Sequence, residues 1–228
     1  MIKKIIGKIV DTILPPANSE EASKPAPDAP KPKVKTISLE ELLGGGAPPK
    51  EPDLRVIGLY SSVEDEKIAE LTQALLYLNE MNRLLPEGED KKPVEFYINT
   101  YGGSADDMFA LYDVMQTIMQ ETEIHTIGVG KVMSAGTLLL AAGTKGKRKI
   151  GKNCRVMIHN VAAGNFGTLP NLANELEAIQ QLQDDYITAM VENTKFTRKK
   201  LEKLLNEKVN IYLDAEEAVK YGLADEIM

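Results

Sequence analysis

A sequence of 228 residues that is 43% hydrophobic can form one globular domain of ordinary size with an appended segment. The formal net charge of −7 argues against the clustered basic surface that nucleic-acid binding needs, and one cysteine with two histidines excludes an internal disulfide and a Cys/His zinc cluster. The composition therefore predicts a cytoplasmic protein that uses no metal and binds no nucleic acid.

The first 52 residues differ from the rest of the chain. Apolar spacing over residues 1–14 predicts a short amphipathic helix that ends before Pro15-Pro16. Two roles remain open for it: docking within the protein's own oligomer, which we favour, and binding at a membrane surface. Residues 15–52 are rich in Pro, Ala and Lys, which predicts a flexible linker. No apolar run approaches the roughly 20 residues that span a bilayer, and Lys8 and Asp11 interrupt any signal-peptide core, so membrane insertion and secretion are not expected.

From residue 53 onward, short apolar runs alternate with stretches of helical spacing. We expect strands at 55–60, 94–99, 124–129 and 155–158, with helices between them; Ser61 and Glu64 predict a capping box before the first helix. Such alternation is typical of an α/β fold with parallel strands, in which sites gather at the carboxyl ends of the strands. Asn99, Gly130 and His159 are each predicted to lie at such an end.

The last third of the chain is predicted to be mainly helical. Apolar residues from Leu172 to Met190 indicate a helix of about six turns, longer than covering a sheet requires. Two shorter helices are expected at 197–205 and 215–221, the second with a capping box of Asp214 and Glu217.

A hydroxyl nucleophile needs a base, a group that orients the base, and donors for the developing oxyanion. Ser134 is expected at the start of a helix, where the N–H of Ala135 is free of helical bonds. The Gly102-Gly103 turn lets backbone approach a ligand and offers the N–H of Gly103 as a second donor, and His159 is a candidate base. Each signal alone is weak, because serines often cap helices and Gly-Gly pairs often form simple turns.

Four sequence blocks, taken together, are more specific. They are YINTYGGSADDMFALYDVMQ, GVGKVMSAGTLLLAAGTKGKR, NCRVMIHN and YLDAEEAVKYGLADEI, and in this order they closely resemble the signature blocks of the Clp protease proteolytic subunit family, ClpP. The resemblance covers residues 53–228. It implies a ClpP/crotonase-like α/β fold of superhelical βαβ units in a ring of seven subunits. Residues 171–193 match the protruding handle helix through which two rings of that family stack.

The resemblance also implies roles for individual residues. Ser134 matches the nucleophile, His159 the base, and the N–H groups of Gly103 and Ala135 the oxyanion hole. Residues 161–168 match the segment beside which a peptide adds as an extended strand. The residues expected to bind substrate are Gly102, Val161, Ala162, Ala163 and Gly164.

The third member of the triad departs from the family pattern. The family has Asp where this chain has Asn210, and an Arg that pairs between rings is replaced by Val209. An amide oxygen can hold the ring of His159, but it carries no charge to stabilise the imidazolium. Asn210 is therefore the predicted third catalytic residue; the alternative, in which it is a turn residue and Asp214 or Glu207 orients the base, remains open.

The expected docking pocket for a hexameric ATP-driven unfoldase of the AAA+ type is also altered. Tyr97, Ile127 and Val129 keep its apolar character. Glu95 and Lys149 replace aromatic residues, and we expect these two to pair across neighbouring strands. Weak docking is expected.

The predicted function is that of a serine endopeptidase acting through an acyl-enzyme on Ser134, with no cofactor. Two alternatives stand beside it. One is a catalytically weak or inactive subunit of a mixed ring, which Asn210 favours. The other is an acyl-CoA enzyme of the crotonase type, which also uses two backbone N–H groups at an oxyanion but needs no Ser-His pair.

Overall fold

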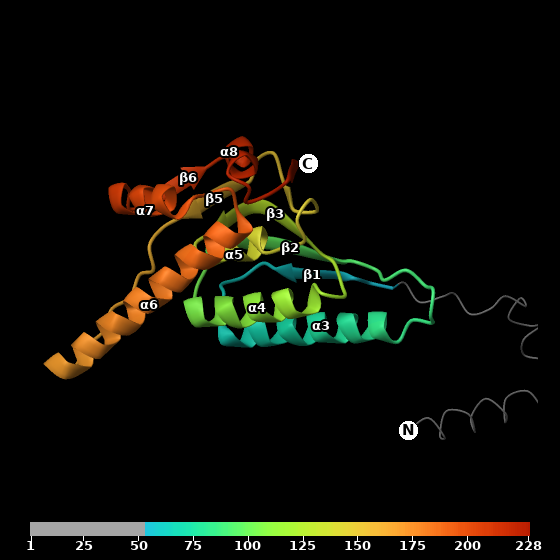
Figure 1. Ribbon diagram of the computed structural model, residues 1–228, viewed down its shortest axis with the longest axis horizontal. Coiled ribbons are helices and arrows are strands. Elements are labelled where there is room, and N and C mark those ends of the chain that lie inside the picture. The colour runs from blue at the N-terminus through green and yellow to red at the C-terminus, as the bar shows by residue number, and fades with distance from the viewer. Residues whose placement is uncertain (1–52) are drawn as a thin grey trace, which may run out of the picture. The chain divides into compact units, whose positions relative to one another are not determined.

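The computed structural model describes residues 53–228. The helix expected over residues 1–14 and the linker expected over 15–52 lie outside the described residues. Within the described part, strands alternate with helices along the chain, as the hydrophobic pattern predicts, and helices pack against a mostly parallel sheet (Figure 1).

The sheet is divided along its longest strand, β3. The strands of its main path, in spatial order, are β1 (Val56–Leu59), β2 (Val94–Thr100), β3 (Ile124–Met133), β4 (Lys149–Ile150) and β7 (Glu226–Ile227), all parallel. The first half of β3 pairs with β4, whereas Lys131–Met133 pair with β5 (Arg155–Ile158). A last strand, β6 (Ile211–Leu213), runs antiparallel to β5. The division brings the carboxyl end of β5 beside the carboxyl end of β3.

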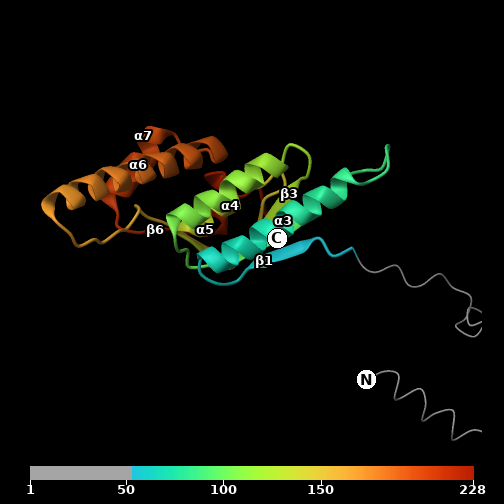
Figure 2. The same ribbon diagram turned by 90° about the horizontal axis from the view of Figure 1, so that it is seen from below.

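Two helices cover one side of the sheet. They are α3 (Asp65–Arg83) and α4 (Ala105–Ile118), which lie side by side (Figures 1 and 2). The apolar stripes predicted from the sequence are their buried faces: Ile68, Leu71, Leu75 and Leu78 on α3, and Met108, Leu111, Met115 and Ile118 on α4. The short helix α5 (Ala135–Ala141) is buried along its whole length, so the turn that precedes it is held by core packing.

A long helix, α6 (Leu169–Asn193), leaves the body of the domain (Figure 1). Its last turns are buried, with Met190 inaccessible to solvent, whereas Leu169 and Leu176 near its beginning are 81% and 56% exposed. The predicted protruding helix is thus present and begins two residues before Asn171. The chain then forms α7 (Arg198–Glu207) and α8 (Ala215–Lys220), and α8 has the predicted capping box of Asp214 and Glu217.

The capping box predicted for Ser61 and Glu64 is wrong. Helix α3 begins at Asp65, Glu64 is its N-cap without a side-chain bond, and the Ser61 hydroxyl donates to the Ser62 carbonyl. The Ser61 carbonyl accepts the hydroxyl of Thr100 (2.6 Å), and Val63 bridges to Gly103. These contacts hold residues 61–63 against the end of β2, so the helix begins only after them.

Two expectations about the strands are also corrected. Gly130 lies inside β3, because pairing with β5 extends this strand to Met133. Glu95 and Lys149 do not lie on neighbouring strands: Glu95 is in register with His125 of β3, which separates β2 from β4. Lys149 Nζ instead lies 3.9 Å from Glu226 Oε2 of β7.

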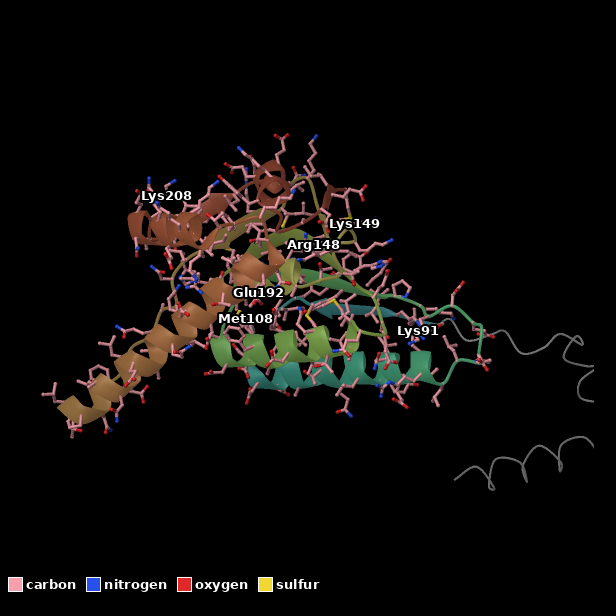
Figure 3. The ribbon with its side chains drawn as sticks, in the orientation of Figure 1. Lys91, Met108, Arg148, Lys149, Glu192 and Lys208 are labelled. Carbon is pink, nitrogen blue, oxygen red and sulfur yellow. The ribbon has the colours of Figure 1, made fainter. Side chains whose placement is uncertain are left out.

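The structure also defines the surroundings of three further side chains. His125 is a strand residue whose Nε2 lies 2.8 Å from Glu123 Oε2, and Cys154 is buried, which raises the pKa of its thiol to about 11. Arg148, directly before β4 (Figure 3), is buried and pairs with Asp225 at 2.6 Å, which ties the end of the chain to the core. Across residues 53–228, no helix is long and apolar enough to cross a membrane, and no group of three or more metal-binding side chains gathers.

Candidate active site

Ser134 occupies a tight turn between β3 and α5. With φ of 53° it is the one non-glycine residue with positive φ in the described chain, a conformation that costs energy for an L-residue. Its N–H donates to the Met157 carbonyl (2.8 Å), and its carbonyl accepts the N–H and the hydroxyl of Thr137 (2.9 and 2.6 Å). Packing and hydrogen bonds on both sides therefore hold the strained turn.

His159 reaches this turn because of the division of the sheet. It follows β5 directly, and β5 is paired with the last residues of β3, which lead into Ser134. The ring Nε2 lies 2.8 Å from Ser134 Oγ. In the tautomer with the proton on Nδ1, Nε2 accepts the serine proton, which is the arrangement of a nucleophile with its general base.

The Gly102-Gly103 turn closes over the serine. Gly102 has φ of 99°, and a Cβ atom there would lie 2.5 Å from the Ser134 Cβ. The turn is fixed by Val63, whose N–H donates to the Gly102 carbonyl (2.9 Å) and whose carbonyl accepts the N–H of Ser104 (2.8 Å). Among the hydrogen bonds of residues 53–228, the N–H groups of Gly103 and Ala135 have no partner. Both residues line the same pocket as Ser134 and His159, so two donors remain for an oxyanion.

The pocket has a volume of about 660 Å³. Its walls are the start of α4, the Ser134 turn, residues 159–163 and α6; Met108 marks the side of α4 that faces α6 (Figure 3). Of the predicted substrate-binding residues, Val161, Ala162 and Ala163 line it, whereas Gly102 and Gly164 do not.

Residues 161–168 belong to no strand in the structure, although the family match predicts an edge for a bound peptide. The N–H of Val161 donates to Gln183 Oε1 of α6 (2.6 Å), and the residues that follow are exposed. Their backbone groups have no neighbouring strand, which leaves them available to an extended peptide.

Asn210 lies opposite His159 but does not bond to it. Ile158 and Ile211 form the last pair of the β5–β6 ladder, so Asn210 is the next residue along, and it is exposed. No partner is found for His159 Nδ1 among residues 53–228. Asp214 caps α8 (2.9 Å to the Glu217 N–H) and Glu207 lies 3.7 Å from Lys203, and neither bonds to the ring. The catalytic role of Asn210 stays a prediction.

The pocket lining contains acidic side chains and no lysine or arginine. The carboxylates that line the pocket are Asp106, Glu175 and Asp185. Gln181 donates to Asp185 Oδ1 at 2.9 Å. The pocket is therefore electronegative toward a bound peptide.

Sequence reasoning missed two residues of this site. Thr137 donates its hydroxyl to the Ser134 carbonyl, and Tyr186, which the sequence places only in an apolar stripe, lines the pocket with its hydroxyl 2.9 Å from Thr137 Oγ1. Threonine three residues after the serine is a weak local signal. The tyrosine is 52 positions away from Ser134 and has no signal in the sequence.

Comparison with known proteins identifies the class that this fold and site define. The family model of Clp protease matches residues 52–228, which shows that the chain belongs to the Clp protease family. The chain is also similar to the ATP-dependent Clp protease proteolytic subunit of Deinococcus radiodurans, with 34% identity over 174 residues, or 76% of this chain and 80% of that protein. The resemblance drawn from the four sequence blocks is confirmed.

Proposed function

We propose that the chain is a serine endopeptidase that cleaves peptides and unfolded proteins through an acyl-enzyme on Ser134. The observation that carries this proposal is the 2.8 Å contact between Ser134 Oγ and His159 Nε2 in a pocket of peptide-binding size. The family membership supports peptide hydrolysis as the reaction.

The proposed reaction follows from the geometry. A peptide lies extended beside residues 161–168, with its scissile carbonyl oxygen facing the N–H groups of Gly103 and Ala135. His159 removes the proton of Ser134 as Oγ forms a bond to the carbonyl carbon. The protonated ring then passes this proton to the leaving amine as the C–N bond breaks. Water, deprotonated by the same ring, attacks the ester; the acid product leaves and Ser134 recovers its proton.

Assembly into a ring is part of the proposal. The exposed beginning of α6 carries Leu169, Leu172 and Leu176, an apolar row that a monomer leaves in water. We expect a homo-oligomeric ring of seven subunits, with stacking of two rings weakened by Val209 in place of arginine. The relative in Deinococcus radiodurans is named ATP-dependent. For this chain we expect weak docking of an AAA+ unfoldase, because Glu95 and Lys149 bring charge to an apolar pocket.

A second candidate is an inactive or weak subunit of a mixed ring. It is favoured by one observation, the absence of a carboxylate bonded to His159 among residues 53–228. An uncharged partner costs about 10⁴ in rate in chymotrypsin-type enzymes.

Labelling with a fluorophosphonate separates the two candidates, because the reagent needs an activated serine. We expect the full chain to be labelled and to hydrolyse fluorogenic peptides, and Ser134→Ala to do neither at the same oligomer size by light scattering. Absence of both reactions in the unmodified, correctly assembled protein would establish the inactive subunit.

A further inference from the structure

A buried chain of hydrogen bonds joins the root of α6 to the nucleophile turn. Tyr186 of α6 places its hydroxyl 2.9 Å from Thr137 Oγ1 in the first turn of α5. Thr137 Oγ1 in turn lies 2.6 Å from the Ser134 carbonyl oxygen. Tyr186 is 4% exposed and Thr137 is inaccessible, so water does not compete for either bond.

The direction of these bonds follows from the groups themselves. A carbonyl oxygen only accepts, so Thr137 donates its single hydroxyl proton to Ser134. Burial raises the pKa of Tyr186 to about 12, which keeps the phenol protonated at neutral pH. Thr137 Oγ1 has no second proton, and Tyr186 is therefore the donor in the 2.9 Å bond. Donation by the phenol polarises the threonine hydroxyl and strengthens its bond to Ser134.

The Ser134 carbonyl and the Ala135 N–H are two ends of one peptide plane. None of the described peptide bonds is cis, so this carbonyl and this N–H point in opposite directions from a rigid unit. A bond that pulls the carbonyl toward Thr137 turns the N–H of Ala135 away from the core. Ser134 has φ of 53° and ψ of −125°, so this plane follows a strained residue and needs such support.

We propose that Thr137 and Tyr186 are positioning residues, which hold the Ser134–Ala135 peptide plane and so aim the Ala135 N–H at the oxyanion. The inference rests on the proposed peptidase function. Through the Thr137 hydroxyl, the projecting helix α6 is connected to the turn that carries Ser134. Thr137 N–H also bonds to the Ser134 carbonyl (2.9 Å), so loss of the side-chain bond loosens the plane without releasing it.

The test compares Thr137→Val, which keeps the shape and removes the hydroxyl, with Thr137→Ser, which keeps a hydroxyl. Removing one oxyanion donor costs about 10²–10³ in kcat, and a misaimed donor costs less. We expect kcat on a fluorogenic peptide to fall about 10-fold in Thr137→Val and to recover in Thr137→Ser, with KM within about twofold of the parent. Tyr186→Phe should lower kcat about threefold. The double variant should have the same kcat as Thr137→Val, because Tyr186 acts through Thr137.

Matched controls come from the same core. Thr126 is inaccessible and donates its hydroxyl to the Leu140 carbonyl at the other end of α5 (2.8 Å), and Tyr112 accepts a bond from Asn193. Thr126→Val and Tyr112→Phe should lower the melting temperature about as much as the test variants and leave kcat unchanged.

A second readout separates positioning from general loosening. A peptide aldehyde forms a tetrahedral adduct whose oxygen occupies the oxyanion hole. The affinity for the aldehyde should therefore fall in Thr137→Val in parallel with kcat, whereas KM should stay within about twofold of the parent's.

The outcomes are distinct. If the parent protein hydrolyses nothing, the proposed function fails. If the parent is active and Thr137→Val and Tyr186→Phe keep the parent's kcat and aldehyde affinity, this inference is wrong. If Thr137→Val does not fold, Tyr186→Phe decides: a kcat below that of Tyr112→Phe at a similar melting temperature supports the inference, and a kcat equal to the parent's overturns it.

Discussion

The two halves of the candidate catalytic pair are held to different degrees. Ser134 is fixed by its own N–H, by two bonds to its carbonyl and by a glycine turn with no room for a side chain. The ring of His159 has one hydrogen bond in the described chain, to Ser134 itself, and Asn210, the next residue beyond the β5–β6 ladder, is exposed. Packing and hydrogen bonds thus hold Ser134 and the glycine turn in place, whereas the ring of His159 is held in the described chain by its bond to Ser134 alone.

The largest effect is expected when Ser134 or His159 is replaced. Ser134→Ala and His159→Ala should each lower peptide hydrolysis by at least about 10³-fold, because both the nucleophile and its base are needed for acylation. His125→Ala is the matched control: this histidine lies on β3 and bonds to Glu123, and its loss should leave kcat/KM unchanged. Near-parental hydrolysis in either active-site variant would exclude the assignment of the pair.

The next largest effect is expected at Gly102, which lies against Ser134. In Gly102→Ala the new Cβ would meet the Ser134 Cβ at 2.5 Å, and we expect about a 10²-fold loss of kcat. Gly88→Ala carries similar backbone strain (φ of 94°) with no atom within 4 Å, so it should cost stability and leave kcat unchanged. If Gly102→Ala keeps the kcat of Gly88→Ala, the close contact with Ser134 does not matter for catalysis.

The base side is tested at Asn210. Asn210→Ala should lower kcat about 10-fold if the amide orients the ring, and Asn210→Asp should raise it at neutral pH by stabilising the imidazolium. Asn206→Ala, also exposed, serves as the control. If Asn210→Ala matches the parent and Asn210→Asp is no better, the amide has no part in catalysis.

The smallest effect concerns substrate charge. Because Glu175 and Asp185 line the pocket without a basic neighbour among its lining residues, peptides with lysine or arginine near the scissile bond should show a KM a few-fold lower than glutamate analogues. The preference should weaken in 0.5 M salt and in the variant Glu175→Gln/Asp185→Asn. Asp184→Asn removes a carboxylate paired with Arg198 and should leave the preference intact. A salt-independent preference would contradict an electrostatic cause.

Local pattern in the sequence was enough to predict the elements with strong periodicity and to point to the candidate reacting groups. Apolar stripes placed α3, α4 and the long helix α6, because burial of a helix face requires that spacing. Asp214 and Glu217 predicted their capping box, because such a cap depends only on neighbours in the chain. The four blocks pointed to Ser134, His159, Gly103 and Ala135, and the structure brings these four residues to one pocket.

Tertiary structure alone decided the features that depend on distant partners. The division of β3 between β4 and β5 carried His159 to Ser134 and separated Glu95 from Lys149, and no local pattern specifies which strand is a neighbour. The predicted capping box at Ser61 does not form, because the Ser61 carbonyl already accepts a hydrogen bond from the Thr100 hydroxyl. Tyr186 entered the site because α6 folds back on α5 and presents its hydroxyl to Thr137. In each case the deciding contact joins residues far apart in the chain, and such contacts exist only after the chain has folded.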